Sequence, residues 1–118
     1  MKLLKNANVY TPAPLGKQDV LIEGEKVLRI AEEIRGYEGL PDVEVYDLAG
    51  KTLVPAYIDL HVHITGGGGE QGPASRVPES SLSTFFKNGI TTVVGLLGTD
   101  GITRSLENLV AKARALTE

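Results

Sequence analysis

The sequence predicts an α/β protein with a small N-terminal β-domain. The first part of the chain consists of short apolar stretches cut by turn residues. The second part alternates apolar strand-like runs with segments of helical periodicity. Strand, helix, strand, helix is the order of right-handed βαβ units, whose strands lie in a parallel sheet. We therefore expect a β-sandwich-like domain over residues 1–52 and two βα units over residues 53–118.

The expected β-domain contains three strand regions. The first, around Val9 and Tyr10, ends at the turn sequence TPAPLG. Residues 20–22 and 27–30 read as a β-hairpin around a Gly-Glu turn. After a second turn cluster, residues 43–47 alternate between apolar and polar side chains, which is typical of a further strand.

An apolar strand-like run extends from Thr52 to Ile64, interrupted by Pro55, and leads into the expected βα units. A first helix is expected from Pro78, which suits a first helical turn, to a stop at Asn88-Gly89. Residues 90–101 are apolar without alternation, as in a strand covered on both faces. A second helix follows, with Ser105 as its N-cap.

Two βα units cannot close a barrel, which takes eight such units and about 250 residues. The chain also stops at Glu118, directly after an apolar helical stripe. We therefore expect the N-terminal fragment of a longer protein. The alternative is a complete small α+β domain, in which two parallel strands would leave apolar faces and edges uncovered.

Composition excludes several classes of function. The chain has 118 residues and a net charge of -3, and its 12 Lys and Arg are scattered among 15 Asp and Glu. This distribution indicates no nucleic-acid or membrane surface. The absence of cysteine excludes disulfides and thiolate metal sites. No signal peptide or membrane-spanning run is recognisable, so we expect a cytoplasmic protein.

The two histidines of the chain lie at the end of the first strand of the βα region. Asp59, His61 and His63 project from one face of this strand, and the histidines are about 7 Å apart along the backbone. Two neutral imidazoles at this spacing can converge on one metal ion. The pair also occurs by chance at polar strand ends. Asp59 either orients a ligand or is a structural acid.

A glycine run follows the histidines directly. Residues 66–69 allow backbone amides to approach a ligand, although such runs are also flexible linkers. Glu70 is either a ligand for a substrate ammonium group or a solvated loop acid. Thr99 and Asp100 follow the second strand, and they either line the same rim or form the turn that starts a helix.

These residues resemble a known group of enzymes. LVPAYIDLHVHITGGGGEQGP, residues 53–73, resembles the first barrel strand of the amidohydrolase superfamily. The Gly-Gly-Gly-Gly-Glu run and TTVVGLLGTDGITRSLENLVAKARAL more narrowly resemble the isoaspartyl dipeptidases, zinc metallopeptidases that hydrolyse β-aspartyl dipeptides. The resemblance extends over essentially the whole chain. It implies that residues 53–118 are the first two βα units of a truncated metal-dependent-hydrolase (β/α)8 TIM barrel.

The resemblance also implies site residues. His61 and His63 correspond to the pair that binds one metal of a binuclear zinc centre, which activates a bridging hydroxide. The loop that contacts the substrate corresponds to Gly68, Gly69 and Glu70, with the glutamate binding the free α-amino group. Thr99 corresponds to a further substrate contact. Small dipeptides are the implied partners, and the resembled family forms homo-oligomers, octamers among them.

The rest of the implied site lies beyond Glu118. It comprises a carboxylated lysine, two further histidines, the proton-shuttling aspartate and the substrate-binding arginines. We therefore expect no catalytic residue within this chain and no activity from the chain alone. Ala56 and Tyr57 stand where glycine and phenylalanine are usual, beside the expected metal ligands.

Two other functions remain open from the sequence. Another amidohydrolase, such as a dihydroorotase or hydantoinase acting on cyclic amides, shares the histidine pair. Dihydroorotase-like chains usually place arginine two residues after the second histidine, where this chain has Thr65. A non-catalytic β-domain that serves as an interaction module, with purely structural histidines, is the alternative outside the enzymes.

Overall fold

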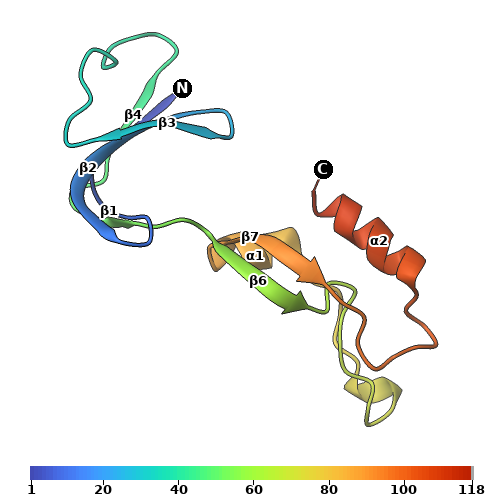
Figure 1. Ribbon diagram of the computed structural model, residues 1–118. Helices are drawn as coiled ribbons and strands as arrows, with labels where there is room; N and C mark the ends of the chain where they lie inside the picture. The colour runs from blue at the N-terminus through green and yellow to red at the C-terminus, as the bar shows by residue number, and fades with distance from the viewer. Residues whose placement is uncertain (118) are drawn as a thin grey trace. The chain divides into compact units, whose positions relative to one another are not determined.

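The computed structural model describes residues 1–117. The last position of the predicted second domain, Glu118, lies outside these described residues. The chain forms two compact units, Met1–Pro55 and Ala56–Glu118 (Figure 1). The first is built of strands and the second of two βα units, so the predicted α/β class with an N-terminal β-region is confirmed. Within residues 1–117, no helix combines the length and apolarity needed to cross a bilayer.

The first unit is a five-stranded mixed sheet. Strand β1 is central, with the antiparallel β2 on one side and parallel strands on the other. The predicted hairpin joins β2 to β3 through Gly24 and Glu25, and the positive φ of 54° at Gly24 explains the glycine. The strands are β1 (Lys2–Tyr10), β2 (Pro14–Glu23), β3 (Lys26–Ala31), β4 (Glu44–Asp47) and β5 (Thr52–Leu53).

A β-bulge in β1 lets this sheet bury side chains on both faces. The pairing with β2 shifts register between Leu4 and Ala7, where Asn6 has a positive φ of 58°. Neighbouring residues of β2 point to opposite faces, so Val20 and Leu21 belong to different apolar clusters. One cluster contains Leu3, Leu21 and Ile34, and the other contains Ala7, Val9 and Val20.

The boundary between the units lies later than the predicted division after residue 52. Thr52 and Leu53 pair with β1, so they belong to the first sheet. Pro55 has no N–H to donate to a ladder, and it separates β5 from β6 (Tyr57–Val62) within the run predicted as one strand.

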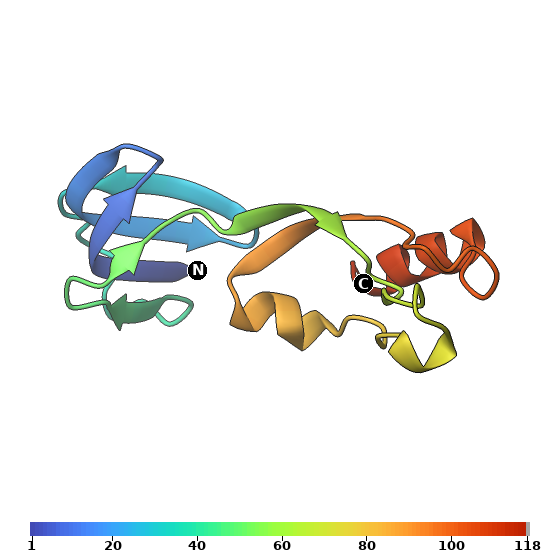
Figure 2. The same ribbon diagram turned by 90° about the horizontal axis from the view of Figure 1, so that it is seen from below.

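The second unit holds the parallel pair β6 and β7 (Ile90–Gly95), joined through the short helix α1 (Leu82–Lys87). Figure 2 shows the two strands side by side with α1 along them. The predicted start of α1 at Pro78 is wrong. Residues 77–80 are not helical, and the Val77 and Ser80 N–H groups donate to carbonyls of the segment after β6. The predicted stop is confirmed, with Asn88 as C-cap.

Helix α2 (Leu106–Ala115) starts as predicted, with the Ser105 hydroxyl accepting from the Asn108 N–H at 3.2 Å. Ile64 is fully buried, and a β-carbon at Gly95 would lie 2.7 Å from its side chain, so glycine makes room for it. The prediction that β7 is covered on both faces is wrong for this chain, since Val94 is 44% exposed. Within residues 1–117, β6 and β7 each keep exposed side chains.

Candidate metal and substrate site

His61 and His63 lie side by side at the carboxyl end of β6. Their ring centroids are 5.2 Å apart and the ring planes are nearly perpendicular, at 89°. His63 Nδ1 lies 3.3 Å from the carbonyl oxygen of Leu96, the residue after β7. A proton on Nδ1 satisfies this contact and leaves the Nε2 lone pair free for a cation.

The neighbouring imidazoles of His61 and His63 would suit shared ligation of one metal ion, to which each would offer a ring nitrogen. Within residues 1–117 no group of three or more His, Cys, Asp or Glu could hold a metal. The described chain therefore offers two imidazole ligands.

Asp59 supports the backbone of this strand. Its Oδ1 accepts the N–H of His61 at 3.0 Å. The sequence left two roles open for Asp59, orienting a metal ligand or serving as a structural acid. This contact favours the structural role, because the carboxylate binds the main-chain N–H of His61 and does not bind an imidazole ring.

The glycine run is an ordered loop. Gly66 is buried and Gly67 to Gly69 are half-buried. The Ser75 hydroxyl accepts from the Gly69 N–H at 3.1 Å and donates to the Gly72 carbonyl at 2.8 Å. Residues Pro73–Ser75 form a 3-10 turn, η1, at the far end of the excursion. These contacts contradict the alternative reading as a flexible linker.

Glu70, Thr99 and Gly68 come together from the two strand-end loops. The Thr99 hydroxyl lies 3.0 Å from Glu70 Oε1 and 3.3 Å from the Gly68 carbonyl oxygen, so it can donate to either. Glu70 is exposed. Hydrogen bonding from its own backbone, and then from Thr99, lowers the pKa of Glu70, and the nearby His63 acts in the same direction. The result is an ionised carboxylate at the rim that carries the histidine pair.

Asp100 closes the turn before α2 and also forms ion pairs. Its carboxylate accepts from the hydroxyl and N–H of Thr103 and from the N–H of Ile102, and these contacts, with Arg76, lower its pKa to about 2. Asp100 Oδ2 lies 3.2 Å from Arg76 Nε. Of the two predicted roles, the structure thus favours the helix-start turn for Asp100. Thr99 instead lies at the rim, where its hydroxyl faces Glu70.

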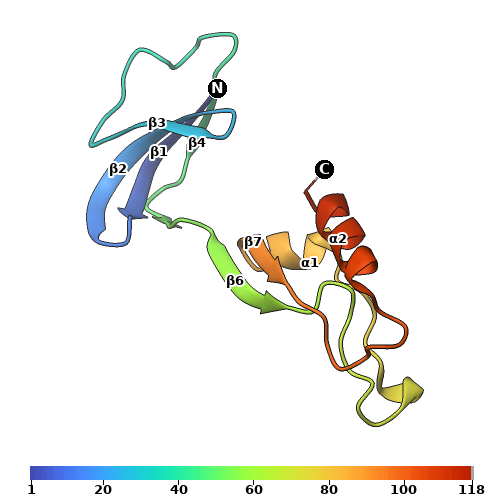
Figure 3. The ribbon, with the colours of Figure 1, turned by 45° about the vertical axis from the view of Figure 1, so that its right-hand side comes forward.

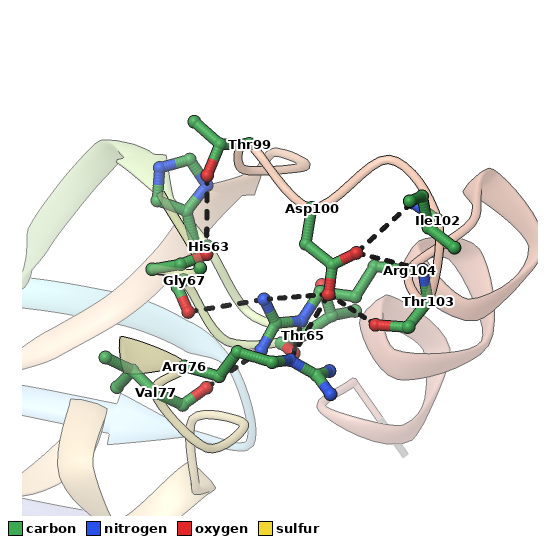
Figure 4. Close-up of polar contacts among 12 residues, drawn as sticks. His63, Thr65, Gly67, Arg76, Val77, Thr99, Asp100, Ile102, Thr103 and Arg104 are labelled. Atoms are coloured by element: carbon green, nitrogen blue, oxygen red, sulfur yellow. Dashed lines mark hydrogen bonds and ion pairs between the residues drawn. The ribbon is translucent and has the colours of Figure 1, made fainter. Parts of the chain in front are cut away.

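Arg104 is the feature that sequence reasoning missed. Its guanidinium is buried and donates to main-chain carbonyls of the glycine loop (Figure 4). Figure 3 shows the excursion between β6 and α1 passing beside the loop that links β7 to α2. The only sequence signal was an arginine four residues after an acid and directly before a helix N-cap.

Gly68 should not tolerate a side chain. Its φ is +71°, and a β-carbon there would lie 2.3 Å from the Ser75 carbonyl oxygen. Gly68→Ala is expected to lower the free energy of unfolding by about 1–3 kcal/mol, the usual cost of a strained backbone position. Urea denaturation of the full-length protein measures this. The matched control is Gly101→Ala, where open space surrounds the added carbon. Equal effects at both positions would contradict the argument.

Comparison with known proteins gives a close likeness to a solved structure. The beta-aspartyl dipeptidase of Fervidobacterium islandicum AW-1 is 52% identical, with a TM-score of 0.89, and the match covers 98% of this chain and 31% of that one. That protein has also been solved in complex with a β-Asp-Leu dipeptide. No known protein-family profile matches the sequence.

More distant likenesses are to enzymes of cyclic amides. A dihydroorotase of Staphylococcus aureus strain Mu50 is 30% identical over all 118 residues, which are 26% of its own length. The D-hydantoinase (dihydropyrimidinase) of a Thermus species is 26% identical, with a TM-score of 0.68, covering 100% of this chain and 25% of that one. The chain thus spans about a quarter to a third of the length of the proteins it matches.

Proposed function

We propose that this chain supplies two metal ligands and the substrate-amine site of a zinc-dependent dipeptidase that cleaves β-aspartyl bonds. Its predicted likeness to the amidohydrolases and to the beta-aspartyl dipeptidase branch is confirmed. The observation that carries the proposal is the ionised Glu70, held by Thr99 at the rim that also carries His61 and His63. The remaining catalytic groups belong to a longer protein that contains this chain.

The chemistry of these residues suits a β-aspartyl dipeptide. Such a substrate carries a free α-ammonium group beside the scissile bond, and a carboxylate is its natural partner. Zinc bound at the histidine pair would lower the pKa of its water to about 7 and polarise the scissile carbonyl. Glu70 would hold the ammonium end in place, and Thr99 would keep the carboxylate pointed at it.

Hydrolysis of a cyclic amide, as by a dihydroorotase, is the second candidate, favoured by the likeness to the Staphylococcus enzymes. Position 65 argues against it. Thr65 is 2% exposed, and its carbonyl accepts from Arg104 Nε at 2.9 Å. A side chain buried in this way does not reach a substrate carboxylate. The proposal includes a cytoplasmic location, which the cysteine-free sequence supports, and no nucleic-acid or membrane partner, which the scattered charges support. It also includes the homo-oligomer that the resemblance implies.

The test is hydrolysis of β-Asp-Leu, α-Asp-Leu and dihydroorotate by the full-length protein with zinc supplied. The proposal expects cleavage of the β-linked dipeptide alone. Cleavage of dihydroorotate alone would establish the second candidate, and cleavage of none of the three would exclude both substrate classes.

The hydroxyl of Thr99 is expected to matter for substrate binding. Thr99→Val removes the donor to Glu70, so the KM for β-Asp-Leu is expected to rise about five- to tenfold, the effect of losing one hydrogen bond to a charged group at an exposed site. Thr99→Ser keeps the hydroxyl and should stay near wild type. Steady-state kinetics of the two variants decide, and an equal rise in both would contradict the role of the hydroxyl, because Thr99→Ser retains it.

A further inference from the structure

Arg104 ties the two ends of the glycine-loop excursion together. Its guanidinium donates from Nε to the Thr65 carbonyl at 2.9 Å, from Nη1 to the Gly67 carbonyl at 3.2 Å and from Nη2 to the Val77 carbonyl at 2.9 Å. Figure 4 shows the guanidinium lying among these groups. Two of the acceptors lie at the start of the excursion and one lies at its end. One buried side chain therefore fixes where the loop leaves β6 and where it returns.

The positive charge of Arg104 has a counter-ion in the same loop system. Asp100 Oδ2 lies 3.9 Å from Arg104 Nη1 and 3.2 Å from Arg76 Nε. Arg76 directly precedes Val77, so the ion pairs and hydrogen bonds join the same two segments. A charged group that is 6% exposed needs such partners, because an unpaired buried charge is strongly unfavourable.

Local structure fixes the direction of Arg104. It directly precedes Ser105, the N-cap of α2. The opposite side of the contact is equally constrained, because a β-carbon at Gly66 would lie 2.2 Å from the Val77 carbonyl oxygen and 2.8 Å from Arg104 Nη2. Glycine at position 66 is thus needed for the loop to close on the arginine.

We propose that Arg104 is a positioning residue that sets the shape of the substrate loop, residues 65–77, and thereby places Glu70 for the substrate amine. The proposal rests on the proposed function for its kinetic part only. Arg104 acts through the main chain, since its donors meet loop carbonyls. Lysine cannot replace it, because three donors on one nitrogen do not span carbonyls that a planar guanidinium reaches with separate nitrogens.

Arg104→Lys in the full-length protein tests the structural part by hydrogen exchange of residues 65–77. We expect exchange of this segment to be faster by about tenfold, as when one charge-assisted hydrogen bond is lost. The matched control is Arg35→Lys, the same substitution at a side chain that is 80% exposed. Asp100→Asn is the second variant, because it leaves the arginine in place and removes its counter-ion. Unchanged exchange in both Arg104→Lys and Asp100→Asn overturns the proposal.

The kinetic part is a double-mutant cycle with Glu70→Gln. If Arg104 acts by placing Glu70, Arg104→Lys raises the KM for β-Asp-Leu about tenfold with little change in kcat, and adds little to Glu70→Gln. Additive effects, or a fall in kcat alone, overturn the positioning role. If the wild-type protein cleaves no β-Asp-Leu, the proposed function fails, and the exchange measurement still decides whether Arg104 holds the loop.

Discussion

Under the proposed function, replacing both His61 and His63 by alanine in the full-length protein is expected to remove bound metal and to reduce β-Asp-Leu hydrolysis at least about a thousandfold, because a metal held by this pair would supply the nucleophile and polarise the carbonyl. The two ring centroids are 5.2 Å apart, and His63 Nδ1 lies 3.3 Å from the Leu96 carbonyl oxygen. Elemental analysis of the purified variant measures the metal directly.

The control for this loss is Tyr57→Phe, at the other end of β6. It should keep the full metal content. Full metal content in the histidine double variant would show that the imidazoles are structural, as an interaction module would require. Circular dichroism of both variants separates loss of metal from loss of fold.

Replacing Glu70 by glutamine is expected to lower kcat/KM for β-Asp-Leu about 10- to 100-fold, the effect of losing a charge-assisted hydrogen bond to the substrate ammonium. The carboxylate is ionised at neutral pH, since its pKa is held below the ordinary value. Glutamine keeps the size and one acceptor oxygen but loses the charge.

Two controls make this result specific. Glu79→Gln changes a carboxylate of the same unit that pairs with Lys112 at 3.0 Å, and it should leave kcat/KM unchanged. N-acetyl-β-Asp-Leu has no ammonium group, so wild type and Glu70→Gln should cleave it equally slowly. A variant that discriminates between the acetylated and free dipeptides as strongly as wild type would exclude Glu70 as the amine ligand.

Much of the fold could be predicted because its signals are local. The hairpin turn at Gly24, the N-cap at Ser105 and the helix stop at Asn88 each depend on residues within a few positions. The histidine pair was predictable for the same reason, since the period of a strand puts His61 and His63 on one face.

The errors arose where distant segments override local preference. Pro78 suits a helix start, but the Ser80 N–H donates to the carbonyl of Ile64, and α1 begins only after Ser81, which occupies the N-cap position. The bulge at Asn6 likewise follows from pairing with β2 and not from a pattern within β1. Such contacts leave no periodicity in the sequence.

The same limit hid Arg104. Its contact with Thr65 joins residues 39 positions apart, so no spacing rule connects them. Glu70 and Thr99, 29 positions apart, could be associated only because both follow strands of one parallel sheet. The rule that ligands bind at the carboxyl ends of parallel strands predicts which residues lie at the edge of a site. It does not predict the buried residues, such as Arg104, that fix the conformation of these loops.

The guanidinium bridge between the two strand-end loops has a consequence for protein engineering. Segments 64–77 and 96–105 take their shapes from each other, through Arg104 on one side and the loop carbonyls on the other. Transplanting the glycine loop alone into another scaffold would leave the Thr65, Gly67 and Val77 carbonyls without their donor. The portable module is the pair of segments, and a chimaera should exchange both or neither.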